Sequence, residues 1–209
     1  MDKKYKIFKY TTNENKNIII DKNINKNIDW YVTFLKIANT LGERSHCISK
    51  KIGCLITKKN RIISTGINGT PQGLFNCDNV FYNGFDIKNE LNREIHHNFS
   101  KKYEIHSEIN AIIHSAKNGI SIKNGSLFVN CCPCNECSKA ILGSGIKNII
   151  FENFYDKDMN GFIFLVLSNM VNVYQVFDDS EENVNKIIKT IDKMNYIIKK
   201  DILNNYNPF

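Results

Sequence analysis

The sequence predicts an α/β domain, with a central mixed sheet of about five strands flanked by helices. Its 209 residues suit a single core, because a chain of this size buries roughly 70% of the surface that the unfolded chain exposes. From residue 106 onward, segments with strand and helix patterns alternate, which is typical of layered α/β domains. The sequence contains no internal repeat with the period of a solenoid.

The predicted elements follow from apolar spacing, helix signals and turn residues. Trp30, Phe34 and Ala38 lie at helical spacing, and residues 58–60 separate two apolar runs as a hairpin turn would. Pro133 opens a helix that ends near Gly143. In chain order we expect a helix over 29–43, hairpin strands over 53–57 and 61–68, a helix over 106–117, a strand over 126–130, a helix over 133–143, a strand over 148–152, a helix over 161–169, a strand over 171–177 and a helix over 180–199.

Three regions of the chain differ in organisation. Residues 1–24 are rich in Lys, Asn and Ile without sustained periodicity, and we expect a poorly ordered N-terminal arm with one short strand at most. Residues 25–177 form the predicted domain, with an irregular insertion at about 72–104. Long irregular stretches are uncommon and often functional. Residues 178–209 form a predicted C-terminal helical extension.

The net charge of +7 suggests nucleic acid as a partner, but the composition weakens this hypothesis. The chain has 32 Ile, 31 Asn and 25 Lys against 3 Arg and 4 Ala, which is a bias toward residues with A- and T-rich codons. A surface that binds nucleic acid would favour arginine, whose planar fork matches phosphates and base edges. We therefore do not expect a nucleic acid partner.

The apolar runs of the chain are short. The longest, residues 162–167, is far below the roughly 18 to 20 residues that cross a bilayer. The N-terminal region also lacks the apolar core of a secretory signal. We expect a cytoplasmic protein without a membrane partner, located in the host cytoplasm if its source is viral.

Four of the seven cysteines lie within residues 131–137, which indicates metal binding or catalysis rather than a disulfide framework. His106 begins one predicted helix, and Cys134 and Cys137 lie in the first turn of the next. Two adjacent helix starts would face one point, where an imidazole and two thiolates suit zinc and leave a fourth position for water. The positive ends of the helices also favour the thiolates.

Glu108 is the predicted proton carrier of this site. A carboxylate beside a zinc-bound water can take its proton and return it to a substrate nitrogen. His-x-Glu followed by Pro-Cys-x-x-Cys is the signature of zinc nucleobase deaminases. A structural zinc half-site and a redox pair are the alternatives for Cys-x-x-Cys alone. We expect Cys54, Cys131 and Cys132 to pack in strands or line the pocket rather than bind metal.

The sequence resembles the deoxycytidylate (dCMP) deaminases, in particular the phage and viral branch of this zinc-dependent cytidine and deoxycytidylate deaminase superfamily. Besides the zinc motif, three stretches carry the resemblance: residues 44–53, residues 61–71 with the pattern Gly-x-Asn-Gly-x-Pro, and residues 143–147. The resemblance as a whole covers roughly residues 28–176. The resemblance implies a three-layer cytidine-deaminase-like fold.

The resemblance also implies two metal sites. The ligands of the catalytic zinc correspond to His106, Cys134 and Cys137, with Glu108 as the proton shuttle. The positions that bind an additional structural zinc in the phage branch correspond to Cys47, Cys77, His96 and Glu104. Two sulfurs, one nitrogen and one oxygen can form a closed tetrahedral set. The alternative is that His96 and its neighbour His97 are surface residues and that both cysteines are buried.

Three residues are implied in substrate binding. Asn68 corresponds to the asparagine of Gly-x-Asn-Gly-x-Pro, which contacts the bound nucleotide in relatives. Tyr155 matches a tyrosine near the phosphate, with an ordinary loop-edge tyrosine as the alternative, and Lys51 is a second phosphate candidate. Cys132 stands where relatives have a serine, which puts a hydroxyl contact at this position in doubt.

The implied activity is hydrolytic deamination of dCMP to dUMP and ammonia, which supplies dUMP for thymidylate synthesis. In this reaction zinc-bound hydroxide attacks C4, and Glu108 protonates N3 and then the leaving amine. The family is commonly a hexamer, activated by dCTP and inhibited by dTTP with Mg²⁺, so we expect a homo-oligomer; the sequence leaves open whether this control is kept. The alternatives are a nucleic-acid or tRNA base deaminase, a deaminase of both dCMP and dCTP, and a structural zinc module.

Overall fold

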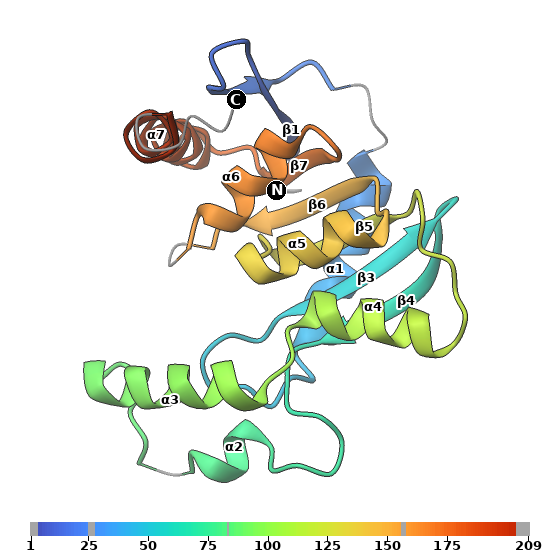
Figure 1. Ribbon diagram of the computed structural model, residues 1–209, viewed down its shortest axis with the longest axis vertical. Coiled ribbons are helices and arrows are strands. Elements are labelled where there is room, and N and C mark those ends of the chain that lie inside the picture. The colour runs from blue at the N-terminus through green and yellow to red at the C-terminus, as the bar shows by residue number, and fades with distance from the viewer. Residues whose placement is uncertain (1–3, 25–27, 83, 156–157, 204–209) are drawn as a thin grey trace.

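The centre of the protein is a seven-stranded mixed sheet, seen in a computed structural model that describes residues 4–24, 28–82, 84–155 and 158–203 (Figure 1). The strand order is β2-β1-β7-β6-β5-β3-β4. Strands β5, β6 and β7 run parallel, and the other neighbours pair antiparallel. The strands are β1 (Tyr5–Thr12), β2 (Ile18–Asp21), β3 (Gly53–Lys58), β4 (Arg61–Ile67), β5 (Ser126–Cys131), β6 (Asn148–Asn153) and β7 (Asn172–Asp178).

Helices cover both faces of this sheet, as predicted. In Figure 1, α1 lies behind the sheet and α4, α5 and α6 lie in front of it. The helices are α1 (Ile28–Gly42), α2 (Cys77–Val80), α3 (Glu90–Tyr103), α4 (Ser107–Lys117), α5 (Asn135–Ser144), α6 (Asn160–Ser168) and α7 (Glu181–Ile197), which a π-helical turn (Ile198–Leu203) continues. The mixed α/β sheet between two helical layers is confirmed, whereas the count of about five strands is wrong.

The alternation of side chains along the strands produces two cores. On β5, Phe128 faces α1 and packs with Phe34 and Ala38. Its neighbours Leu127 and Val129 belong to the larger core on the opposite face, under α4, α5 and α6. Because successive side chains of a strand point to opposite faces, a strand buried on both sides is apolar at nearly every position.

The N-terminal region corrects the prediction of a poorly ordered arm. Its described part forms the hairpin of β1 and β2, and β1 pairs along its length with β7. Ile7 enters the core beside α1, and Phe8 enters the core on the other face. Lys6 and Lys9 interrupt the apolar alternation of β1 in the sequence. In the structure Lys6 forms an ion pair of 2.6 Å with Asp179, and Lys9 extends over an aromatic ring.

The helix predicted over 180–199 is confirmed as α7. Ser180 caps its first turn and accepts a hydrogen bond from the backbone N–H of Asn183. Near its other end, the amide of Asn195 bonds both backbone groups of Ile18 in β2, at 2.6 and 3.0 Å. The C-terminal helix is therefore fastened to the N-terminal hairpin, and the two ends of the chain stabilise each other.

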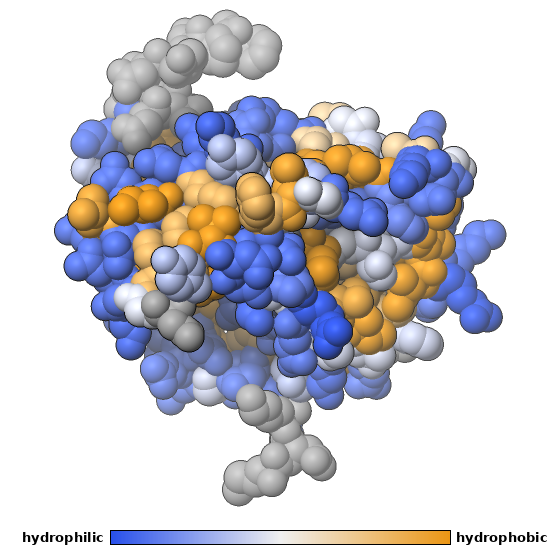
Figure 2. Space-filling view, turned by 90° about the horizontal axis from the view of Figure 1, so that it is seen from below, coloured by the Kyte–Doolittle hydropathy of each residue, from blue (hydrophilic) through white to orange (hydrophobic). Residues whose placement is uncertain are grey.

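The insertion at about 72–104 contains two helices, α2 and α3, which project below the sheet in Figure 1. Figure 2 views this end of the molecule and shows hydrophobic side chains among the hydrophilic ones. The exposed apolar side chains of the insertion include Leu74, Phe75, Tyr82, Leu91 and Ile95. The sequence analysis treated this stretch as irregular and missed both helices, although Leu91, Ile95 and Phe99 recur at helical spacing and Asn89 caps α3. None of the described helices combines the length and apolar character of a membrane span.

Candidate metal centre and substrate pocket

Two helix starts bring the predicted zinc ligands together. His106 is the N-cap residue of α4, and Cys134 is the N-cap residue of α5, directly after β5. Nδ1 of His106 lies 3.4 Å from Sγ of Cys134 and 3.3 Å from Sγ of Cys137. A two-way backbone bridge between Gly69 and Ile105 fixes the segment that leads into α4.

These three side chains fit a zinc ion. Zinc bonds of about 2.3 Å to sulfur and about 2.0 Å to nitrogen, at tetrahedral angles, place the two ligand atoms roughly 3.5 Å apart. The nitrogen–sulfur distances of 3.3 and 3.4 Å agree with this spacing. Three protein donors leave one tetrahedral position for water or substrate.

The electrostatics of the three side chains favour a thiolate next to an imidazolium or a metal. The pKa of Cys134 is lowered to about 4, chiefly by a hydrogen bond from the Cys137 thiol and further by His106. The hydrogen bond to Cys134 in turn raises the pKa of His106 to about 9. Cys134 also lies at the positive end of α5, which stabilises a negative charge there.

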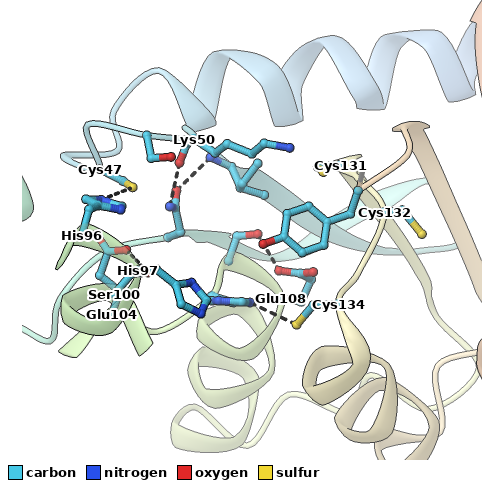
Figure 3. A pocket seen from close by; sticks show the side chains of 16 residues that line it. Cys47, Lys50, His96, His97, Ser100, Glu104, Glu108, Cys131, Cys132 and Cys134 are labelled. Carbon is cyan, nitrogen blue, oxygen red and sulfur yellow. Dashed lines mark hydrogen bonds between the residues drawn. The ribbon is translucent and has the colours of Figure 1, made fainter. Parts of the chain in front are cut away.

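Glu108 lies beside the metal centre without being part of the donor set (Figure 3). Its side chain is only 4% exposed, and Ser107 Oγ donates a 2.9 Å hydrogen bond to one carboxylate oxygen. Burial raises the pKa of Glu108, because a desolvated carboxyl group resists ionisation. The residue can therefore hold a proton close to the fourth tetrahedral position.

Two glycines allow the elements that carry the ligands to pack closely. A Cβ atom at Gly66 of β4 would lie 2.7 Å from the backbone nitrogen of Ala111 in α4. A Cβ atom at Gly161 of α6 would lie 2.5 Å from the carbonyl carbon of Cys134. Only glycine fits at such distances, so each one sets how near its neighbouring segment lies to the rest of the fold.

A second group of possible metal donors consists of Cys47, Cys77, His96 and Glu104. Their donor atoms all lie within 4.8 Å of one another. Nε2 of His96 lies 3.6 Å from Sγ of Cys47 and 3.3 Å from Sγ of Cys77. Ser100 donates to Oε2 of Glu104, while Oε1 is buried without a partner. A buried carboxylate oxygen without a partner suits a metal ion.

The two groups border one pocket. Figure 3 shows Cys47 and His96 at one end and Cys134 and Glu108 at the other. The predicted substrate residues Asn68 and Tyr155 line the same pocket, together with Ser49, Lys50, His97 and Ser100. The structure thus gathers metal centre, proton carrier and substrate candidates around one space.

Asn68 lines the pocket, but its side chain is occupied by the neighbouring loop. Its Nδ2 donates to the carbonyl oxygen of Lys50 at 2.9 Å, and its Oδ1 accepts from the backbone N–H of Ile52 at 2.8 Å. The backbone oxygen of Asn68 accepts a further hydrogen bond of 2.8 Å from Ser45. In this arrangement Asn68 fixes the backbone of residues 50–52.

The two neighbouring lysines point to different places. The ammonium of Lys50 lies 4.8 Å from the centre of the Tyr155 ring, at the pocket. Lys51 is exposed, and its Nζ lies 3.4 Å from the backbone oxygen of Glu43, outside the set of pocket residues. Burial raises the pKa of the half-buried Tyr155, so its phenol stays a hydrogen-bond donor.

Sequence reasoning gave no role in the pocket to six of the residues that line it: Ser49, Lys50, Ile52, His97, Ser100 and Ser107. Lys50 is adjacent to Lys51 and His97 is adjacent to His96, and both neighbours were named in the sequence analysis. This adjacency is the signal that could have found them. Cys131 and Cys132 are buried beside the pocket, and burial raises the pKa of Cys132 well above that of a free thiol. Neither belongs to a donor set, in agreement with their expected place in strand and pocket wall.

Comparison with known proteins supports the same interpretation. Residues 28–153 match the family description "Cytidine and deoxycytidylate deaminase zinc-binding region". Deoxycytidylate deaminase of Enterobacteria phage T2 is 34% identical over 180 residues, which cover 74% of this chain and 96% of that protein. The phage T4 enzyme is 34% identical over 181 residues, or 74% and 92% of the two chains.

A solved structure extends this similarity to the fold. The dCMP deaminase of cyanophage S-TIM5, crystallised in complex with dCMP and dUMP, aligns with a TM-score of 0.56 and 26% identity. The alignment covers 72% of this chain and 98% of the cyanophage chain. The resemblance found in the sequence is confirmed, and the chain belongs to the cytidine and deoxycytidylate deaminase zinc-binding family.

Proposed function

We propose that this protein deaminates dCMP to dUMP and ammonia. The observation that carries the proposal is a metal centre with three donors, His106, Cys134 and Cys137, beside a buried carboxyl group that is not a ligand. Such a centre serves hydrolysis, because one position stays open and a proton carrier stands next to it. The similarity to enzymes named for deoxycytidylate supports dCMP as the substrate.

The side chains of the chain account for the proton transfers. Zinc, when bound by His106 and the two cysteines, supplies a Lewis acid that lowers the pKa of a water molecule. Glu108 accepts the proton of the water that attacks C4 of cytosine and delivers it to N3. Glu108 then takes the remaining proton from the hydroxyl group on C4 and passes it to the exocyclic nitrogen, so that the C4 carbonyl of dUMP forms and ammonia leaves. Because Glu108 is buried and receives a hydrogen bond from Ser107, its carboxyl group keeps one orientation throughout.

The test compares ammonia release from dCMP, dCTP, deoxycytidine and CMP by the zinc-loaded protein. We expect the highest kcat/KM for dCMP. Single-stranded DNA and tRNA should give no product. Equal rates with dCMP and dCTP would indicate a deaminase of both nucleotides, and product from nucleic acid alone would contradict the proposal.

We also propose that Cys47, Cys77, His96 and Glu104 hold a second, structural zinc. Four donors from four points of the chain form a closed set, and the unpartnered oxygen of Glu104 supports a ligand there. Such an ion would tie the insertion at about 72–104 to the segment that follows α1.

Further expectations extend this proposal to binding and assembly. Asn68 and Tyr155, which line the pocket, remain candidates for contact with the nucleotide, whereas Lys51 lies outside the pocket. The nucleotides dCTP and dTTP and the ion Mg²⁺ remain candidate regulators. A homo-oligomer, such as a hexamer, is the expected assembly. The phage relatives support action in the cytoplasm, which would be that of the host if this chain is viral. Sedimentation with and without dCTP tests the assembly and the regulation together.

A further inference from the structure

The pocket is poor in positive charge for an enzyme that binds a phosphate. Among the described residues that line it, Lys50 is the only lysine or arginine. Two carboxyl groups, Glu104 and Glu108, line the same space. A nucleoside monophosphate carries close to two negative charges at neutral pH, so its phosphate needs a cation in the pocket that offsets its desolvation.

The backbone at Lys50 is held in place before any substrate arrives. The side-chain amide of Asn68 donates to the carbonyl oxygen of Lys50 at 2.9 Å. It also accepts a hydrogen bond of 2.8 Å from the backbone N–H of Ile52. The hydroxyl group of Ser45 in turn donates a hydrogen bond to the backbone oxygen of Asn68, which holds Asn68 in place. A preorganised loop loses little conformational entropy on binding, which increases the affinity for a ligand that it contacts.

The side chain of Lys50 is also oriented. It is half-buried, and its ammonium lies 4.8 Å from the centre of the Tyr155 ring, on the wall opposite the loop. The face of an aromatic ring attracts a cation and leaves the other N–H groups of the ammonium free to donate. Figure 3 shows Lys50 at the pocket between the two groups of metal donors.

Lys51 does not have these properties. It is exposed, and its ammonium lies against the backbone oxygen of Glu43 rather than in the pocket. The two lysines are adjacent in sequence, and the loop directs one toward the pocket and the other toward solvent.

From this placement we propose that Lys50 recognises the 5′-phosphate of the nucleotide and makes the enzyme selective for the monophosphate over the nucleoside. Lys50 acts as a point charge on the phosphate, Tyr155 orients it, and Asn68 positions its backbone. This inference rests on the proposed function, because it takes the substrate to be a pyrimidine nucleoside monophosphate.

The experiment compares Lys50→Gln, Lys50→Arg and Lys51→Gln with the wild type. Lys36→Gln is the control for net charge, since this exposed lysine of α1 lies outside the pocket. We expect Lys50→Gln to raise KM for dCMP by roughly 10- to 100-fold, the range for a lost hydrogen bond to a charged group, with little change in kcat. The kcat/KM for deoxycytidine should stay at the wild-type value.

The other variants test whether the effect depends on the positive charge and on its position at residue 50. Lys50→Arg should recover most of the affinity, because the charge is retained. Lys51→Gln should have a clearly smaller effect than Lys50→Gln, and Lys36→Gln should behave as the wild type. Zinc content and thermal midpoint, measured for every variant, identify any loss of folding.

Binding without turnover provides a second readout. In a Glu108→Gln background, calorimetric titration with dCMP and with deoxycytidine measures affinity directly. Adding Lys50→Gln should lower the affinity for dCMP by the same roughly 10- to 100-fold and leave the affinity for deoxycytidine unchanged.

Three outcomes would overturn the assignment of Lys50: an unchanged KM for dCMP, an equal loss for dCMP and deoxycytidine, or a larger effect from Lys51→Gln. The failure of the proposed function would look different, because the wild type itself would then not deaminate dCMP.

Discussion

The two groups of metal donors lie at the ends of one pocket and differ in how they are built. The catalytic group takes three donors from two helix starts and has Glu108 beside it as a carboxyl group that binds no metal. The other group takes four donors from four points of the chain and includes its own carboxylate, that of Glu104, among them. A donor set of three leaves a reactive position, whereas a set of four closes the metal off.

The surroundings of the two groups differ in the same sense. The catalytic group rests on the sheet core through α4 and α5. The second group holds α2 and α3, which expose several large apolar side chains and have few buried ones. An exposed hydrogen bond of 2.7 Å between His46 and Asp78 adds little to this attachment. The proposed second zinc therefore implies that the stability of the insertion depends on donors and metal more than on packing.

The largest expected effect tests the free carboxyl group of the catalytic site. Glu108→Gln preserves the shape of the side chain and removes the proton carrier, so we expect kcat to fall by at least about 100-fold. Zinc content and the thermal midpoint should match the wild type. A variant that keeps more than about a tenth of the activity would remove the distinction between the two groups.

The second prediction concerns the closed donor set. Metal analysis of the purified protein should give about two zinc ions per chain, and Cys77→Ser should reduce this to about one. The thermal midpoint should also fall, because a metal that binds only the folded state stabilises it. Cys54→Ser is the matched control, since Cys54 is buried but belongs to neither group. A wild-type content of one zinc would contradict the second site.

The third prediction concerns the loop between the two groups. Asn68→Ala removes both hydrogen bonds that fix the backbone of residues 50–52, so we expect kcat/KM for dCMP to fall by roughly 10- to 100-fold. Deoxycytidine should be affected less, because the loop presents Lys50. Zinc content must stay at the wild-type level for this interpretation to hold. Wild-type kinetics in the variant would show that the loop does not depend on Asn68.

The smallest expected effect separates the ring of Tyr155 from its hydroxyl group. A cation–π contact contributes about 0.5 to 2 kcal/mol. Tyr155→Leu should therefore raise KM for dCMP by up to roughly 30-fold, whereas Tyr155→Phe, which keeps the ring, should raise it by less than about threefold. An equal rise in KM in both variants would indicate direct contact of the phenol with the substrate. It would contradict the role of the ring in orienting Lys50.

The catalytic group was predictable because its donors lie in short, contiguous motifs whose spacing places them at helix starts. The second group comes from three separate segments, namely the loop after α1, the start of α2, and α3 with its C-cap residue, and it was found through the family resemblance rather than through spacing. Lys50 was passed over in favour of Lys51, because two adjacent lysines look alike in the sequence and only the folded loop places Lys50 at the pocket and Lys51 outside it. The hairpin of β1 and β2 was missed because lysines interrupt its apolar pattern, while ion pairing and ring contacts place them at the surface.

Gly66 and Gly161 have a consequence for how this enzyme can change. Neither lines the pocket, yet any larger side chain at either one displaces a segment that carries a metal ligand. In a random library screened for a new nucleotide preference, inactive clones should therefore be enriched in substitutions at these two positions. Substitutions at Ser49 or His97, which line the pocket without belonging to a donor set, should be found among the clones that survive. Residues of the pocket wall such as Ser49 and His97 can therefore change when a new substrate is selected, whereas Gly66 and Gly161, where neighbouring segments pack closely, cannot.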